Sequence, residues 1–158
     1  MKISPSVAQD DSLCSENPAG PCGFVVFGAS GDLTKRKLIL SLYHLYCREL
    51  LSEHFYFLGC GRTEYSDDDY REEIRKTLLD KVSDDSKVKS FLRKLYFCVG
   101  DYDDEGFYGK LKARLSELNE SHGTDSHVVF YLSVPPFLYT VISSHLRDAG
   151  LSCDRGSK

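Results

Sequence analysis

The chain has 158 residues, of which 41% are hydrophobic and 28% charged, and its formal net charge is −4. This length and composition predict a single domain with a packed core. The acidic balance argues against nucleic acid or a membrane surface as the main partner. No apolar run approaches the ~20 residues of a membrane span. We therefore expect no nucleic acid and no membrane among the partners.

Residues 1–22 are rich in Ser, Asp, Pro and small residues, which predicts a disordered lead-in. They lack the apolar segment of a secretory signal and the Arg-rich amphipathic pattern of an organelle transit peptide. Residues 151–158 are a short polar tail. The domain itself is expected over residues 23–150, in the cytoplasm.

The cysteines show no Cys-x-x-Cys spacing, which argues against a zinc site. Without a secretory context we expect small, buried free thiols in a reducing compartment. The six are Cys14, Cys22, Cys47, Cys60, Cys98 and Cys153.

A continuous apolar run, Phe24 to Phe27, leads into the glycine turn Gly28-Ala29-Ser30-Gly31. A long amphipathic segment follows at once. A strand, a Gly turn and a helix in this order are how a parallel α/β sheet presents phosphate to backbone N–H groups and to the positive end of a helix dipole. The alternative is a turn that needs glycine only for its backbone conformation and binds nothing.

The first helix is expected from about Gly31 to about Leu51. Lys35, Arg36 and Lys37 lie near its N-terminus, where cations oppose the helix dipole unless an anion is nearby. A phosphate partner fits this placement, and a solvated basic face is the alternative for each of the three residues.

The second strand is expected over Phe55 to Gly59, and its tip carries Arg62, with no carboxylate before Glu64. In dinucleotide-binding folds an acidic residue at this tip favours NAD, whereas a basic residue favours the 2′-phosphate of NADP. The planar guanidinium donates two hydrogen bonds to a phosphate. Together with the Gly turn, Arg62 predicts NADP, although alone it could be a surface arginine.

The segment after Arg62 carries helix signals and a third strand. Ser66 followed by three aspartates predicts a helix N-cap and not a metal site, because adjacent residues point in different directions round a helix. Further helix is expected over about 84–94, a strand over 95–99, a helix with the apolar positions Phe107, Leu111, Leu115 and Leu118, and a polar loop over 119–126.

The fourth strand, Val128 to Ser133, is apolar throughout, which predicts an inner parallel strand covered on both faces. Proline cannot continue the ladder, so the strand stops at Pro135 and a helix follows from Pro136 to Gly150. Its inward positions are predicted to be Phe137, Val141, Ile142, Leu146 and Ala149.

Strands that alternate with helices predict an α/β, Rossmann-like parallel sheet with helices on both faces. We expect strand one in the centre beside strands two and four, with strand three outside strand two. The ligand should bind where the strand order reverses, above Gly28 and near Val134-Pro135.

The run Gly28-Ala29-Ser30-Gly31-Asp32-Leu33-Thr34-Lys35-Arg36-Lys37-Leu38 resembles the N-terminal coenzyme motif of the glucose-6-phosphate dehydrogenase family. The resemblance continues through residues 59–62, 100–103 and 130–136 and covers roughly residues 23–150. One departure is Leu40, where the family often has proline.

The resemblance implies oxidation of glucose 6-phosphate to 6-phosphogluconolactone, with hydride passed to NADP, in the pentose phosphate pathway of glucose metabolism. It also implies which residues bind NADP. These are the pyrophosphate loop, Gly28, Ala29, Ser30, Gly31, Asp32, Leu33, Thr34 and Lys35; the 2′-phosphate reader, Arg62; and the nicotinamide wall, Val134, Pro135 and Tyr139.

The family's next elements are a strand ending in Glu-Lys-Pro-Phe-Gly and a segment with the catalytic histidine, and neither occurs in these 158 residues. The resemblance therefore predicts a sheet truncated after strand four, no catalytic residue in this chain, and binding of glucose 6-phosphate only if the missing C-terminal portion is supplied. None of the five histidines lies in the catalytic context.

Two other interpretations stay open. One is a stand-alone nucleotide-binding or interaction module, in which case strand four would be an unprotected edge unless a complementing chain pairs with it. The other is a fragment of the related hexose-6-phosphate dehydrogenase of the endoplasmic reticulum, which the absence of a signal peptide disfavours. Paired cysteines would favour the latter, and free thiols the cytoplasm.

Overall fold

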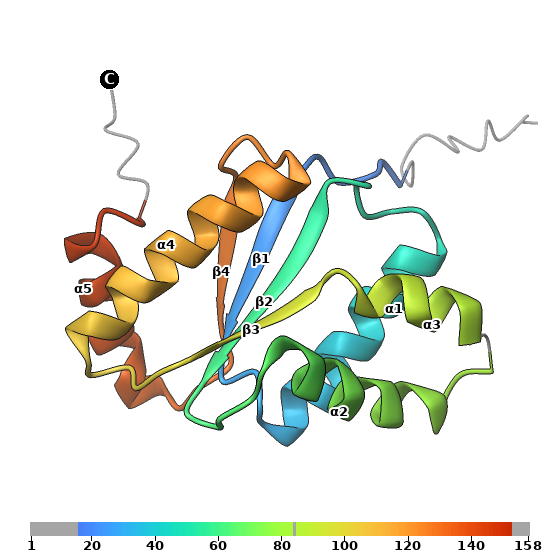
Figure 1. Ribbon diagram of the computed structural model, residues 1–158, viewed down its shortest axis with the longest axis horizontal. Helices are drawn as coiled ribbons and strands as arrows, with labels where there is room; N and C mark the ends of the chain where they lie inside the picture. The colour runs from blue at the N-terminus through green and yellow to red at the C-terminus, as the bar shows by residue number, and fades with distance from the viewer. Residues whose placement is uncertain (1–15, 84, 153–158) are drawn as a thin grey trace, which may run out of the picture.

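A computed structural model describes residues 16–83 and 85–152, which form one sheet of parallel strands with helices on both faces (Figure 1). Most of the predicted lead-in and tail, residues 1–15 and 153–158, therefore lies outside the described residues, as do Cys14, Cys153 and Asp84. The strands are β1 Cys22–Phe27, β2 Phe55–Gly61, β3 Leu95–Val99 and β4 Val128–Leu132. The helices are η2 Thr34–Leu38, α1 Ile39–Cys47, α2 Asp67–Leu79, α3 Asp85–Leu92, α4 Glu105–His122, η3 Pro136–Leu138 and α5 Tyr139–Asp148.

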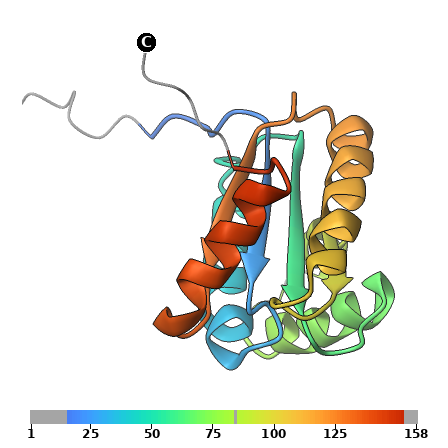
Figure 2. The ribbon, with the colours of Figure 1, turned by 90° about the vertical axis from the view of Figure 1, so that its left-hand side faces the viewer.

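The strand order is β3-β2-β1-β4, and every pair is parallel. This confirms the predicted fold class and the central place of β1. The chain passes from β1 outward to β2 and β3 and then returns to the other side of β1 for β4. The order therefore reverses between β1 and β4, at the carboxyl ends of the strands (Figure 2).

Alternate residues of β1 face opposite layers of helices, as the period of two in a strand requires. Val26 packs in the core under α1, α2 and α3, whereas Val25 and Phe27 pack in the core under α4 and α5. Figure 1 shows these two groups of helices on opposite sides of the sheet. Both faces of β1 and β2 are therefore buried beneath helices, which accounts for their nearly unbroken apolar sequences.

The predicted first helix is broken into two parts. Residues Thr34–Leu38 form a π-helix, in which the N–H of Ile39 bonds to the carbonyl of Thr34, and α1 ends at Cys47 instead of continuing to Leu51. Glu49 adopts φ +58°, and a left-handed residue at this place ends the helix.

Two further predictions about helices are wrong. The polar loop expected from Asn119 is helical as far as His122, because α4 ends only where Gly123 takes a left-handed conformation with φ +66°. The side chain of Phe137 is 76% exposed, since residues 136–138 form a 3-10 turn before α5 and direct it outward.

The prediction that strand four is covered on both faces is also wrong. Val128, Phe130 and Leu132 pack toward α4 and α5, but Val129 and Tyr131 are 48% and 44% exposed on the opposite face. Among the described strands, β4 pairs with β1 alone. Within the described residues β4 is therefore the outer strand of the sheet, although its apolar sequence predicted an inner one.

The N-cap predicted at Ser66 is confirmed, and the three aspartates that follow it have separate partners. Ser66 and Asp69 form a reciprocal capping box. Asp68 pairs with Arg71, and Asp67 accepts the backbone N–H of Phe97 on β3. Among the described residues no group of three or more His, Cys, Asp or Glu could hold a metal ion.

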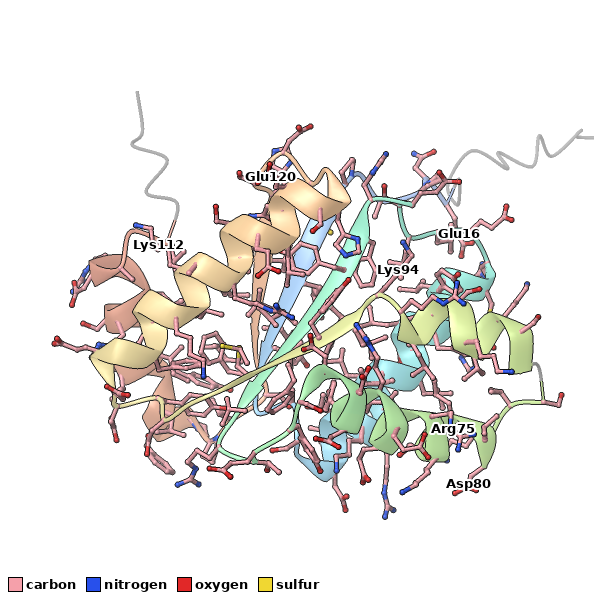
Figure 3. The ribbon with its side chains drawn as sticks, viewed as in Figure 1. Glu16, Arg75, Asp80, Lys94, Lys112 and Glu120 are labelled. Carbon is pink, nitrogen blue, oxygen red and sulfur yellow. The ribbon has the colours of Figure 1, made fainter. Side chains whose placement is uncertain are left out.

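Charged side chains such as Arg75, Asp80, Lys112 and Glu120 lie on the outer sides of the helices (Figure 3). No helix in the described part of the chain is both long and apolar enough to cross a membrane. Of the predicted lead-in, residues 16–21 precede β1 without forming a helix or strand, and Glu16 makes an ion pair with Arg48 of the segment after α1.

Candidate functional site

A pocket of about 450 Å³ lies at the carboxyl ends of β1, β2 and β4, where the strand order reverses. It is lined by residues from four separate segments, one at the end of each strand, which meet because the sheet is parallel. They are Gly28, Ser30, Gly31, Gly61, Arg62, Thr63, Tyr102, Ser133, Val134, Pro135 and Leu138.

The floor of the pocket is the turn after β1. Gly28 has φ +84°, and a Cβ atom there would collide with the carbonyl oxygen of Ser133. The helix begins at Asp32, immediately after Gly31. The first N–H groups of a helix have no acceptor within it, so this end of the turn offers backbone donors to an anion.

Tyr102, from the loop after β3, fixes the turn from the side. Its hydroxyl accepts the N–H of Gly28 at 2.6 Å and donates to the carbonyl of Cys60 at 3.0 Å. Burial raises the pKa of Tyr102 to about 12, an effect that the Gly28 hydrogen bond partly offsets, so the hydroxyl stays protonated at neutral pH. The ring also lines the pocket, so Tyr102 both holds the turn and shapes the cavity.

Thr34 joins the turn to the end of β4. It is fully buried, and its Oγ1 lies 3.1 Å from the carbonyl oxygen of Gly28 and 3.0 Å from Oγ of Ser133. The N–H of Ser133 in turn donates to the carbonyl of Phe27, which extends the β1–β4 ladder by one residue. The two strand ends that flank the reversal of strand order are thus linked by side chains as well as by backbone.

Arg62 lies at the tip of β2, exposed and on the rim of the pocket. Among the described residues, no carboxylate lies within ion-pair distance of it, whereas most arginines of the helices are paired. An exposed, uncompensated guanidinium at the mouth of a pocket is suited to bind an anion.

The opposite wall is apolar and comes from the segment after β4. Val134, Pro135 and Leu138 line it. Tyr139, which we predicted as part of this wall, begins α5 and is 42% exposed, and it is not among the lining residues.

Five residues of the predicted loop, the buried Thr34 among them, do not line the cavity. Ala29 is fully buried beneath it, where its methyl group packs close to the Cα of Gly59, and Leu33 is 60% exposed. Asp32 is exposed and forms an ion pair with Arg36 across one helical turn. None of them lines the pocket.

Lys35, the fifth, is directed toward α2. Its ammonium group bonds to Glu73 at 3.1 Å, and this bond together with Tyr65 raises the pKa of Lys35 although burial alone would lower it. Lys35 is therefore held by a protein carboxylate, and in this conformation it does not reach the pocket.

Sequence reasoning missed five lining residues: Gly61, Thr63, Tyr102, Ser133 and Leu138. Gly61, Tyr102 and Ser133 fall within the segments that carry the family resemblance, so reading those segments as one carboxyl edge would have found them. Thr63 follows Arg62 directly, and Leu138 depends on the 3-10 turn, which no local pattern predicts.

A second pocket of about 450 Å³ lies beside β3, between α2 and α4, and its charged groups are already engaged. Arg114 pairs with Asp67 and Glu117, and Lys110 donates to the carbonyl of Val99. Equal volume therefore does not make this pocket an equivalent anion site, because its cations have partners within the protein.

The parallel sheet, the glycine turn and the pocket at the reversal of strand order define a Rossmann-like nucleotide-binding domain. Residues 25–158 match the family described as glucose-6-phosphate dehydrogenase, NAD binding domain. The chain therefore belongs to the glucose-6-phosphate dehydrogenase family, of which it represents the coenzyme-binding portion.

Individual relatives agree with this assignment. The chain is 43% identical over 139 residues to glucose-6-phosphate 1-dehydrogenase of Aggregatibacter actinomycetemcomitans, covering 87% of this chain and 28% of that protein. It is 32% identical over 130 residues to the Leuconostoc mesenteroides enzyme, covering 82% and 27%.

Among solved structures, a glucose-6-phosphate dehydrogenase in complex with glucose 6-phosphate superposes with a TM-score of 0.76 at 30% identity, covering 90% of this chain and 30% of that one. The chain thus spans less than a third of the length of the relatives it matches.

Proposed function

We propose that this chain binds NADP across the carboxyl edge of β2, β1 and β4, as the coenzyme half of a glucose 6-phosphate dehydrogenase. The observation that carries the proposal is that Arg62 and the Gly28–Gly31 turn, which lie far apart in the sequence, line one pocket. A cation at one end and backbone donors in the middle match the 2′-phosphate and the pyrophosphate of this coenzyme.

The residues fall into three roles along the coenzyme. Arg62 pairs with the 2′-phosphate, and Thr63 and Gly61 lie beside it. Ser30 and Gly31, with the helix start at Asp32 and Leu33, receive the pyrophosphate. Val134, Pro135 and Leu138 form the wall at the nicotinamide end, with Tyr139 beyond it.

The glycines are needed here because the main chain itself forms the binding surface. A side chain at Gly28 would strike Ser133, and one at Gly31 would crowd the carbonyl oxygen of Gly28 at 3.2 Å. Ala29 supports the turn from below. Lys35 is proposed as a coenzyme ligand only if it exchanges Glu73 for a phosphate oxygen, which its ion pair opposes.

We propose the oxidation of glucose 6-phosphate for a protein as long as the relatives, and not for these 158 residues alone. Hydride transfer needs the sugar held against the nicotinamide and a base within reach of its hydroxyl. None of the described residues that line the pocket is a histidine. We therefore expect the 158 residues to bind coenzyme without turnover, and glucose 6-phosphate to bind only when further segments are supplied.

The edge of β4 is where such a segment, or a complementing chain, is proposed to add. Val129 and Tyr131 leave apolar surface exposed beside a strand that has one described neighbour. An extended segment that pairs there would cover both the ladder and these side chains.

We also propose a cytoplasmic location. The four cysteines that the structure describes are free, and burial raises the pKa of Cys60 and Cys98, so neither thiol is poised to react. A thiol titration of the native and unfolded chain that finds paired cysteines would contradict this and favour a secretory compartment.

Calorimetric titration with NADP and then NAD tests the coenzyme proposal. We expect NADP to bind at least ten-fold more tightly than NAD, and Arg62→Ala to remove that preference, which corresponds to about 1.4 kcal/mol or more. Lys37→Ala is the matched control, because it removes an exposed cation from the same end of the sheet outside the pocket. Equal affinity for both coenzymes, or no effect of Arg62→Ala, would contradict the proposal.

A further inference from the structure

Thr34 and Ser133 form a chain of two hydroxyl groups that runs from the buried turn to the surface of the pocket. The carbonyl oxygen of Gly28 lies at the inner end, 3.1 Å from Thr34 Oγ1, and Ser133 Oγ follows 3.0 Å further on. Thr34 is fully buried, whereas Ser133 lines the pocket. Of the two hydroxyls, only that of Ser133 is positioned to meet a ligand.

The hydroxyl protons of Thr34 and Ser133 can be arranged in two ways. A carbonyl oxygen only accepts, so if Thr34 donates to Gly28, Ser133 must donate to Thr34 and presents lone pairs to the pocket. If Thr34 donates to Ser133 instead, the Ser133 proton is released toward the pocket. The Gly28 carbonyl then keeps the N–H of Gly31 as a donor at 3.1 Å, so neither arrangement leaves a buried group unpaired.

The place of Ser133 in the sheet decides which half of a dinucleotide it meets. Arg62 is at the tip of β2 and Ser133 is at the end of β4, with β1 between them. Two strand spacings separate these tips, roughly 10 Å. A coenzyme whose 2′-phosphate lies at Arg62 therefore places its other half near Ser133.

We propose that Ser133 donates a hydrogen bond to the nicotinamide-bearing half of the coenzyme, at a phosphate or ribose oxygen, and that Thr34 is a positioning residue that orients this donor. The proposal rests on the proposed function and gives Thr34 an indirect role. A ligand oxygen selects the arrangement in which Thr34 donates to Ser133. The hydroxyl pair thus adapts to an acceptor without moving the backbone.

The test compares NADP with adenosine 2′,5′-bisphosphate, which carries the 2′-phosphate and one 5′-phosphate but lacks the nicotinamide half. Affinities are measured by calorimetry for the wild-type chain, Ser133→Ala, Thr34→Val and the double variant. We expect Ser133→Ala to weaken NADP about ten-fold, as for a hydrogen bond to a charged or strongly polar group, and to leave the bisphosphate within two-fold. Arg62→Ala should weaken both ligands alike.

Thr34→Val keeps the shape of the side chain but removes the hydroxyl, so it should weaken NADP several-fold and add little to Ser133→Ala in the double variant. Thr34→Ser keeps the hydroxyl and should restore binding. Thr34→Val keeps the methyl group and loses the hydroxyl, whereas Thr34→Ser loses the methyl group and keeps the hydroxyl. Weak NADP binding by Thr34→Val alone therefore traces to the hydroxyl and not to lost packing.

The outcomes distinguish this proposal from the proposed function. If the folded wild-type chain binds neither ligand, both are overturned. If it binds both ligands, but Ser133→Ala weakens them equally or not at all, only the role of Ser133 is overturned. If Thr34→Val and Thr34→Ser bind NADP equally well, the positioning role of Thr34 is overturned.

Discussion

The two edge strands of the sheet, β3 and β4, differ in the side chains that surround them. At β3, helix side chains occupy backbone groups of the strand: Asp67 accepts the N–H of Phe97 at 2.8 Å, and Arg71 donates to the carbonyl of Leu95 at 2.8 Å. At β4, by contrast, the exposed residues on one face are Val129 and Tyr131, which are apolar.

This difference shows where the molecule is closed and where it can accept more protein. Charged side chains from α2 and α4 satisfy the edge of β3 much as a further strand would, so strand addition there would have to displace them. Among the described residues, no side chain is seen to bond to the backbone of β4, and this edge adjoins the candidate pocket through Ser133 and Val134. A segment added beside β4 would therefore lie next to the end of the pocket that we propose for the nicotinamide.

The largest effect on stability is expected at the close contact between Gly28 and Ser133, at the end of β4. Gly28→Ala would combine a left-handed backbone with a collision against Ser133, and we expect it to destabilise the chain by about 3 kcal/mol. Urea unfolding measures the change. Gly109→Ala is the matched control, because nothing lies near its side-chain position on α4, and it should stabilise by about 0.5–1 kcal/mol. Similar stability of the two variants would contradict the close contact.

An intermediate effect is expected from opening the β3 edge. Asp67→Ala leaves the N–H of Phe97 without its acceptor and Arg114 without one of its two carboxylates, so a loss of about 1–3 kcal/mol is expected. The adjacent Asp68→Ala, whose carboxylate is 92% exposed, should change the free energy of unfolding by less than about 0.5 kcal/mol. If the two alanine variants unfold at the same urea concentration, side chains do not stabilise this edge.

The smallest effect on stability is expected at β4. Val129→Lys places a charge on a side chain that is already 48% exposed, so the free energy of unfolding should change by less than about 0.5 kcal/mol. Self-association at high concentration should fall, because a lysine on an edge strand opposes pairing. Sedimentation of both chains measures this, and a large loss of stability would mean that the face of β4 is buried in solution.

Much of the fold followed from local sequence signals. The apolar strands, the glycine turn and the cap at Ser66 each depend on neighbouring residues, and the alternation of strands with helices predicted the parallel sheet. The exposure of one face of β4 could not be predicted, because an apolar edge strand such as Val128–Leu132 has the same composition as an inner one. The outward direction of Phe137 depends on a short 3-10 turn rather than on helical periodicity.

The candidate site was only partly predictable for a similar reason. Arg62 and the turn were found because each follows a strand directly, and residues at strand ends meet at one edge. Thr34 and Lys35 belong to the same motif, yet one is buried under the turn and the other pairs with Glu73 of α2. Such partners come from distant segments, so no local pattern distinguishes a direct ligand from a supporting residue.

We propose that coenzyme occupies the pocket near β4 and not the pocket of equal volume beside β3. Amide chemical shifts of the labelled chain, followed during titration with NADP, distinguish the two pockets. We expect the largest changes at Gly31, Arg62 and Ser133, with Lys110 and Arg114 unchanged. Changes centred on Lys110 and Arg114, or none in a folded sample at millimolar NADP, would contradict it.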